Sequence, residues 1–433
     1  MYENITKEML FFIEASPSCY QAAANIIEKL EEQNYTFLPE NSEWKLEEGG
    51  AYYTERNGSS VIAFRIPDGE ASSFRIMASH SDSPTFKIKP EPEMKTAGAY
   101  VRLNIEKYGG MLCNTWFDRP LGIAGRVIVR EEDGTLAAKN VFLDEDICMI
   151  PSLAIHMDRT QNENHAVNVQ NDMPPIFGDE EAEGAFLKRI AEAADAEEEQ
   201  ILGCDIFLVN RQKGTFVGVN HEYIASPRLD DLECAYTTLA GFLESGSVEM
   251  SDEFPAAASI PVLAVFDNEE VGSLTRQGAD STFLEDVLER IAEGLSWSRG
   301  RYHAAVADSF MISADNAHAL HPNFPGKADP VNRPVMNKGI VLKFHAGQKY
   351  TTDGMSEAFF KKTCMDAEVP FQIFTNRADM AGGSTLGNIS NAHVSIRTAD
   401  IGLAQLAMHS AMETAGAKDP MYLAAFAETF FRG

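Results

Sequence analysis

The chain has 433 residues, 44% of them hydrophobic, and a formal net charge of −29. This length exceeds the size at which single hydrophobic cores usually stop growing, so two domains are expected. The negative charge argues against nucleic acid and anionic membranes as main partners. No apolar run reaches the ~18 residues of a membrane span, and the first residues lack the regions of a secretory signal. With six scattered cysteines and no C-x-x-C pair, the sequence predicts a cytoplasmic protein with reduced thiols.

The two ends of the chain predict an α/β domain. Apolar side chains at positions 23, 26, 27 and 30 have the i, i+3, i+4, i+7 spacing of an amphipathic helix. Two apolar strands are expected next, at 60–65 and 74–78. After residue 226, helical segments alternate with apolar strands, a pattern typical of α/β folds. These later strands are expected at 262–266, 310–312, 340–344, 371–374 and 393–396.

The middle of the chain has a different character. Short β-like runs dominate, at 101–105, 123–130 and 206–209, and no convincing crossover helix occurs before the acidic segment 182–194. We therefore predict a discontinuous catalytic domain, residues 1–90 and 224–433, with helices around a mixed, mainly parallel sheet. An inserted β-rich domain at 91–223 would interrupt it.

Candidate catalytic side chains follow the clearest buried strand, 262–266. Asp267-Asn-Glu269-Glu270 comes directly after it, and ligands in α/β folds bind beyond the carboxyl ends of strands. Two adjacent carboxylates there can divide the chemistry. One can bind a metal, and the other can take a proton from a metal-activated water. An acidic surface turn is the alternative for an isolated Glu-Glu pair.

A second candidate, His80, comes just after the expected strand 74–78. Asp82 could accept the second ring N–H of His80, which would fix its tautomer and raise its basicity. The H-x-D spacing alone is also compatible with a solvated turn closed by Pro84.

Three more candidates lie further along the chain. Asp230 precedes a predicted helix, where it could either bind a metal or cap the helix. Asp315 follows a short apolar strand, and His409 lies in a helical pattern near the C-terminus. Two histidines and several carboxylates suit a pair of metal ions, which needs about five ligands and a separate general base.

Together these segments resemble the aspartyl aminopeptidase-like M18 family of metallo-aminopeptidases. The matching strings span nearly the whole chain in family order, and six such strings together are specific. They are His80-Ser-Asp82, Pro151-Ser-Leu-Ala-Ile-His156, Ser226-Pro-Arg-Leu-Asp-Asp231, Asp267-Asn-Glu-Glu-Val-Gly-Ser273, Ser313-Ala-Asp-Asn-Ala-His318-Ala-Leu-His-Pro322 and Gln405-Leu-Ala-Met-His409-Ser.

The resemblance implies a role for each matching side chain. Two zinc ions per subunit, replaceable by cobalt or manganese, would be held by five ligands. One of these ligands, Asp230, would be shared between the two ions. Glu269 would be the general base, and Asp82 would be the partner of His80. The ligand set is His80, Glu270, Asp230, Asp315 and His409.

The resemblance also implies how peptides bind. His318 would contact the substrate near the scissile carbonyl, and Lys343 would face an acidic N-terminal side chain. An ordinary strand lysine with its amine in solvent is the alternative for Lys343. His156 would reach the active site of a neighbouring subunit. The inserted domain would then mediate dimerisation, within a homododecamer built from dimers.

We therefore expect a metallo-aminopeptidase that removes N-terminal, mainly acidic, residues from peptides. A related two-metal deacylase or amidohydrolase is an alternative, because it would share the mechanism. A non-catalytic peptide-binding assembly protein is another. The presence of Glu269 argues against the last, since metal binding alone needs no base.

Overall fold

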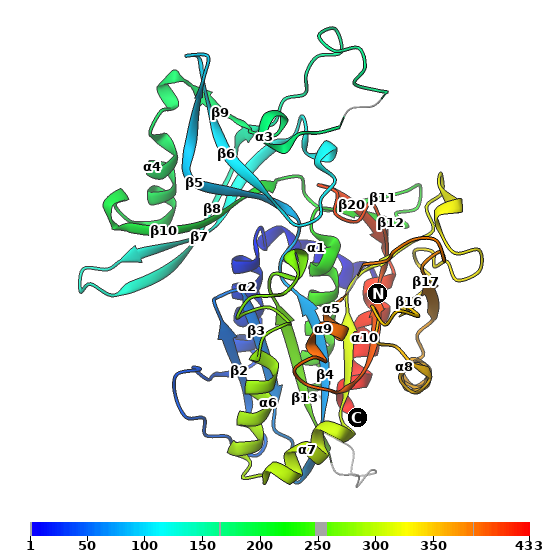
Figure 1. Ribbon diagram of the computed structural model, residues 1–433. Coiled ribbons are helices and arrows are strands. Elements are labelled where there is room, and N and C mark those ends of the chain that lie inside the picture. The colour runs from blue at the N-terminus through cyan, green and yellow to red at the C-terminus, as the bar shows by residue number, and fades with distance from the viewer. Residues whose placement is uncertain (1, 164–165, 247–257, 384) are drawn as a thin grey trace.

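A nine-stranded sheet forms the centre of the molecule in the computed structural model, which describes residues 2–163, 166–246, 258–383 and 385–433 (Figure 1). The strand order is β1-β2-β3-β13-β4-β14-β18-β16-β17. The strands are β1 (Thr36–Phe37), β2 (Ala51–Arg56), β3 (Ser60–Arg65), β4 (Ala71–His80), β13 (Ala258–Phe266), β14 (Phe310–Ala314), β16 (Ile340–Phe344), β17 (Phe371–Thr375) and β18 (Arg397–Gly402).

Parallel pairing dominates the middle of this sheet. Strand β4 pairs in parallel with both β13 and β14, and β14 pairs in parallel with β18. Antiparallel pairs occur at β2–β3, β3–β13 and β16–β18. The predicted mixed, mainly parallel sheet is therefore confirmed. Because Phe266 is opposite His80 in the register, the carboxyl ends of β4 and β13 meet at one edge.

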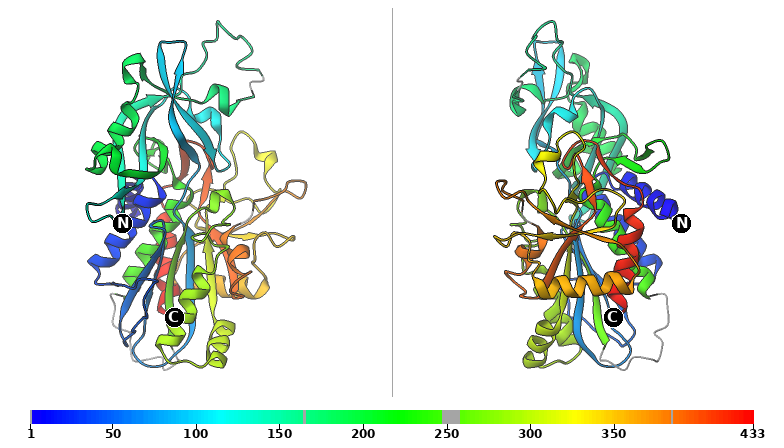
Figure 2. Two further views of the ribbon diagram at one scale, coloured as in Figure 1. Left: turned by 60° about the vertical axis from the view of Figure 1, so that its left-hand side comes forward. Right: turned by 90° about the vertical axis from the view of Figure 1, so that its right-hand side faces the viewer.

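Helices cover both faces of the sheet, so β13 and β14 are continuous apolar runs with buried side chains. One core lies under five helices, and a second lies on the opposite face under three (Figure 2). The first group is α1 (Tyr2–Ala15), α2 (Cys19–Glu32), α5 (Leu229–Gly246), α8 (Gly354–Asp366) and α10 (Asp419–Arg432). The second group is α6 (Phe283–Gly294), α7 (Arg299–Asp308) and α9 (Leu386–Ser390).

A closed six-stranded barrel stands at one end of the molecule, with its own apolar core (Figure 1). It contains the predicted β-like runs 101–105, 123–130 and 206–209, and helix α4 overlaps the predicted helix 182–194. Its strands are β5 (Thr85–Thr96), β6 (Tyr100–Tyr108), β7 (Pro120–Arg130), β8 (Leu136–Met149), β9 (Ile176–Asp179) and β10 (Ile201–Asn210). Its helices are α3 (Val169–Asp172) and α4 (Ala185–Ala194).

A smaller five-stranded sheet has the order β11-β12-β20-β19-β15. These strands are β11 (Thr215–Val217), β12 (Tyr223–Ser226), β15 (Ala317–His318), β19 (Ala404–Leu406) and β20 (Glu413–Gly416). Short 3-10 helices complete the chain: η1 (Cys113–Trp116), η2 (Glu180–Ala182), η3 (Glu198–Gln200), η4 (Glu269–Val271) and η5 (Pro325–Lys327). In the described ranges, no helix has both the length and the apolar character needed to cross a membrane.

Two local predictions are wrong. Residues 393–396 are not a strand. They form a turn and irregular backbone just before β18, which begins at Arg397. Val394 and Ile396 pack into the core beside α9, so their alternation reflects loop packing. His409 is not helical either. It lies at φ +66° in the turn between the paired strands β19 and β20, and most of the segment 406–412 that gave the apparent helical spacing is this turn.

Candidate metal centre

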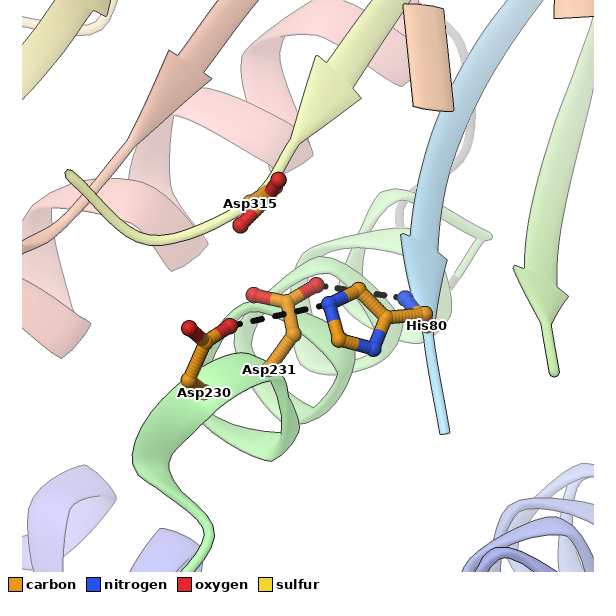
Figure 3. A group of neighbouring side chains, drawn as sticks. All are labelled: His80, Asp230, Asp231 and Asp315. Atoms are coloured by element: carbon orange, nitrogen blue, oxygen red, sulfur yellow. Dashed lines mark hydrogen bonds and ion pairs between the residues drawn. The ribbon is translucent and has the colours of Figure 1, made fainter. Parts of the chain in front are cut away.

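The candidate ligands come from five separate segments and lie together at one edge of the central sheet. His80 ends β4, Asp315 directly follows β14, and Glu270 lies in the 3-10 turn directly after β13. Asp230 stands at the start of α5, and His409 lies in the β19–β20 turn. Figure 3 shows His80, Asp230 and Asp315 facing a common space. Strand polarity explains the grouping, because neighbouring parallel strands present their carboxyl ends at the same edge.

Asp230 lies at the middle of this group. Its Oδ1 is 3.6 Å from Nε2 of His80, and its Oδ2 is 3.4 Å from Nε2 of His409. The same His409 nitrogen is 3.5 Å from Oε2 of Glu270. Sets of three or four ligand atoms lie within 4.8 Å of one another, and two of these sets contain Asp230. The two carboxylate oxygens of Asp230 thus face two different histidines.

Sequence reasoning gave no role to Asp231, which is fully buried beside His80, Asp230 and Asp315 (Figure 3). Its Oδ2 accepts a hydrogen bond from the backbone N–H of His80 at 3.2 Å. Asp230 and Asp231 both have non-helical backbone angles within the bounds of α5, so the two adjacent side chains can both point inward. The consecutive aspartates in the sequence were the signal for this residue.

Asp82 connects His80 to the turn that carries Glu269 and Glu270. Nδ1 of His80 is 3.1 Å from the backbone carbonyl oxygen of Asp82 and 3.3 Å from its Oδ1. The carboxylate of Asp82 accepts the backbone N–H groups of Glu269 at 3.1 Å and Glu270 at 3.2 Å. These contacts leave Nε2 of His80 directed toward Asp230.

A second carboxylate supports the opposite side of the group. Glu413 accepts hydrogen bonds from the backbone N–H groups of Asp230 at 3.0 Å and His409 at 2.7 Å. The Nδ1 atom of His409 is bonded to the backbone carbonyl of Gly110. Both histidines are thus held by Nδ1 contacts, and their Nε2 atoms face the carboxylates. This is the usual arrangement of metal-binding imidazoles.

The electrostatics of the group favour a bound cation. Burial raises the pKa of Glu270, and it raises the pKa of Glu269 to about 8. Burial also raises the pKa values of Asp231 and Asp315. Burial opposes ionisation of Asp230 too, but the nearby imidazoles of His409 and His80 outweigh it and lower the pKa of Asp230. Buried charges in proteins are paired or bind metals, and here the carboxylates outnumber the histidines.

Several buried ligand atoms have no hydrogen-bond partner in the described part of the chain. They are Nε2 of His80, Oδ1 of Asp230, Oδ1 of Asp231 and Oε1 of Glu270. Leaving a buried polar atom unpaired costs about 1–3 kcal/mol, so four of them at one place indicate a site that binds a ligand. Imidazole nitrogen and carboxylate oxygen are the donors that zinc accepts, and the residues therefore fit a zinc centre.

Lys343 and His318 lie beside the centre. The Lys343 side chain, on β16, is only 2% exposed, so the alternative of a strand lysine with its amine in solvent is wrong. Its ammonium lies 5.2 Å from the centroid of the Tyr350 ring. His318 ends β15, keeps an exposed face, and packs edge-on against Phe374 at 6.2 Å between ring centroids.

His156 does not join this group. It lies in an exposed turn between β8 and α3, in a segment that extends away from the barrel (Figure 1). Leu153, Ile155 and Met157 in the same segment are also exposed.

An α/β fold with histidines and carboxylates gathered beyond its central strands is an arrangement suited to a metal-dependent hydrolase. The M18 family profile, described as aminopeptidase I zinc metalloprotease, matches residues 12–431. The chain therefore belongs to the M18 family of zinc aminopeptidases.

Relatives and solved structures agree with this assignment. A probable M18 family aminopeptidase 2 of Clostridium novyi is 43% identical, over 97% of this chain and 96% of that protein. Aspartyl aminopeptidase 1 of Schizosaccharomyces pombe is 36% identical, over 98% of this chain and 94% of that protein. Among solved structures, the Ape4 and Nbr1 complex has a chain with a TM-score of 0.96 and 35% identity, over 100% of this chain and 86% of that one. The S. cerevisiae mApe1 dodecamer has a chain with a TM-score of 0.86 and 29% identity, over 99% of this chain and 97% of that one.

Proposed function

We propose that this zinc aminopeptidase uses two metal ions to remove acidic residues from the N-termini of peptides. The observation that carries the proposal is the position of Asp230, whose two oxygens face His80 at 3.6 Å and His409 at 3.4 Å. A carboxylate between two imidazoles suits a ligand shared by two ions. Together with Asp230, His80 and Asp315 would bind one ion. His409 and Glu270 would bind the other ion. The donor set also admits cobalt or manganese.

Glu269 is the proposed general base. When bound, the zinc ions supply Lewis acidity and lower the pKa of an attacking water toward ~7. Glu269 lies next to the ligand Glu270 in η4, and its carboxylate joins His80 and Glu270 within one 4.8 Å set of ligand atoms. It would take the proton from the attacking water and pass it to the leaving amine. Asp82 would keep His80 and the backbone of this turn in position.

Substrate side chains would be recognised by positive groups at the edge of the centre. At a net charge of −29, the protein repels acidic peptides at long range, so acid selectivity needs a local cation. Lys343 is a buried ammonium beside Asp315, and it would face the acidic side chain of the N-terminal residue. His318, on β15 of the five-stranded sheet, would contact the substrate near the scissile carbonyl.

The predicted inserted domain, residues 91–223, contains most of the barrel, which runs from β5 to β10. It is the proposed dimerisation domain within a cytoplasmic homododecamer built from dimers. His156 would cross the dimer interface and donate to the carbonyl oxygen of the substrate in the neighbouring subunit. Exposed Leu153, Ile155 and Met157 around it favour an interface, because exposed apolar clusters mark protein contacts. The dodecameric state of S. cerevisiae mApe1 supports the assembly.

Hydrolysis of aminoacyl-nitroanilides, with and without a chelator, tests the proposal. We expect chelator-sensitive cleavage that is fastest for Asp and Glu substrates. Preference for Leu or Met would keep the metal chemistry and reject the acidic pocket. Cleavage of acyl-amino acids but not of free N-terminal residues would favour a deacylase. A lack of turnover with bound metal would favour a peptide-binding assembly protein.

A further inference from the structure

One turn of the barrel, Tyr108–Gly109–Gly110 at the end of β6, touches both sides of the metal centre. We infer that this turn positions the metal-binding side chains, and that Tyr108 is a positioning residue that acts through Asp82. The inference rests on the proposed metal centre. It adds a structural link between the barrel and the site.

The hydroxyl of Tyr108 lies between two side chains next to the centre. It donates to Oδ2 of Asp82 at 2.7 Å and accepts from Nδ2 of Asn268 at 2.9 Å. Its ring packs edge-on against Phe207 of β10, with centroids 5.5 Å apart. Burial, and next the charge of Asp82, raise the pKa of Tyr108, so the phenol keeps its proton and remains a donor.

Asp82 transmits this contact to the catalytic turn. Its Oδ1 accepts the backbone N–H of Glu269 and lies 3.3 Å from Nδ1 of His80, while its Oδ2 accepts the backbone N–H of Glu270. Among these contacts of the Asp82 carboxylate, Tyr108 supplies the phenolic donor. The other contacts are made by proposed ligands and by the proposed base. Without it, the Asp82 carboxylate loses one of the bonds that fix its rotation, and His80 loses a fixed partner.

Asn268 gives Tyr108 a second route to the same turn. Asn268 precedes η4 and has φ +62°. Its side-chain oxygen accepts hydrogen bonds from Thr275 at 2.8 Å and Gln277 at 2.7 Å, and its Nδ2 donates to Tyr108. The phenol thus contacts the residue before Glu269 as well as the carboxylate that binds the backbone of Glu269.

The other end of the turn reaches His409. The backbone carbonyl of Gly110 is bonded to Nδ1 of His409, which leaves Nε2 facing Asp230 and Glu270. Gly109, at φ +81°, lies against Glu270, because a Cβ placed on it would be 3.1 Å from Cβ of Glu270. The absence of a side chain at this glycine allows the barrel to approach a proposed ligand directly.

Substitution of Tyr108 by Phe tests the inference, because it removes one oxygen and keeps the ring. We expect zinc affinity, measured by competition with a chelator, to fall by up to about 10-fold, because Tyr108 reaches His80 only through Asp82 and the loss of a direct partner of a metal ligand typically costs about 10–100-fold. The visible absorption of the cobalt-loaded protein should shift, since the orientation of His80 changes. Tyr53→Phe is the matched control. Its hydroxyl is bonded to Glu31 at 2.6 Å, so its loss should lower thermal stability without changing affinity or spectrum.

A double-mutant cycle then asks whether Tyr108 acts through Asp82. If it does, Tyr108→Phe should lower zinc affinity much less in an Asp82→Asn background, because coupled residues are not additive. Unchanged zinc affinity and an unchanged cobalt spectrum in Tyr108→Phe would overturn the inference, as would fully additive effects. Failure of the wild-type protein to bind zinc or cobalt would instead reject the proposed function and, with it, this role for Tyr108.

Discussion

Lys343 donates a hydrogen bond from Nζ to the backbone carbonyl of Asp315 at 2.7 Å, and Nζ lies 3.8 Å from Oδ2 of the same residue. The charge is thus held beside a proposed metal ligand. Burial opposes this charge, but Asp315 and other neighbours outweigh burial and raise the pKa of Lys343. An ammonium has three donors, and the bond to Asp315 uses one. The others are the donors proposed to bind a substrate carboxylate.

Lys343→Met should remove acid selectivity. Truncating one partner of a buried charge pair costs about 2–5 kcal/mol, so kcat/KM for Asp and Glu substrates should fall on the order of 10²-fold or more. Turnover of Leu substrates should change far less. Steady-state kinetics on matched nitroanilides measures both.

Lys362→Met is the control for that comparison, because this lysine is 75% exposed and pairs with Asp366 on α8. It should leave the selectivity unchanged. Zinc content must also be measured, since Lys343 touches Asp315. If Lys343→Met loses zinc and all substrates suffer equally, Lys343 supports the metal centre and does not select substrates.

Glu269→Gln should abolish proton transfer while it preserves the centre. The substitution keeps the size of the side chain, and the backbone N–H of residue 269 can still bond to Asp82. We expect kcat to fall about 10²–10⁴-fold, the typical contribution of a general acid-base group. Zinc content, measured by elemental analysis, should match the wild type. Retained peptidase activity with zinc bound would exclude Glu269 as the base.

Much of this arrangement could be predicted because the chemistry follows buried strands. Glu269 and Glu270 come directly after the apolar run of β13, and Asp315 directly follows β14. In a parallel sheet, the sequence position after a buried strand already implies the edge where ligands bind. For these residues, the local sequence pattern therefore also predicts the position of the site.

Contacts between distant segments could not be predicted in the same way. The bond between Tyr108 and Asp82 joins the last residue of a barrel strand to a residue after β4, and no periodicity in either segment specifies the other. His409 was misassigned to a helix because the apolar side chains of the turn between β19 and β20 imitate helical spacing. Only the pairing of β19 with β20 reveals the turn.

His156→Ala should lower turnover and leave zinc content unchanged. The side chain is exposed and lies outside the ligand group of its own chain, which fits the proposed action on a neighbouring subunit's site. Loss of one donor to a developing oxyanion typically reduces kcat by about 10²–10³-fold. Loss of zinc in proportion to activity would contradict this role.

Mixed oligomers test the crossing of the interface directly. Subunits carrying His156→Ala and subunits carrying Glu269→Gln should each be nearly inactive alone. When they are co-expressed, a His156→Ala site keeps its own base and can receive His156 from its Glu269→Gln neighbour. We expect a measurable fraction of wild-type turnover to return. Mixing the two proteins after assembly is the control, and no recovery on co-expression would contradict a role for His156 in a neighbouring subunit's site.

Asp205 should make the stability of the barrel depend on pH. It lies on β10 and bonds to Lys87 of β5 at 2.9 Å and to Nε of Arg126 of β7 at 3.1 Å. Burial opposes its charge, but these cations outweigh burial and lower the pKa of Asp205 below its usual 3.8. The stabilisation is therefore present above about pH 4 and disappears as the pH falls through the lowered folded-state pKa.

Asp205→Asn should accordingly lower the free energy of unfolding at pH 7 by about 1 kcal/mol, because charge-assisted bonds contribute modestly at a partly exposed site. The difference from wild type should shrink as the pH is lowered from 5 to 2, because the wild-type carboxyl then becomes neutral as well. Melting temperatures across this range measure the effect. Glu132→Gln, at an exposed position after β7, should show no such convergence. A constant difference at every pH would mean that the shape of the Asp205 side chain, and not its charge, holds these three strands.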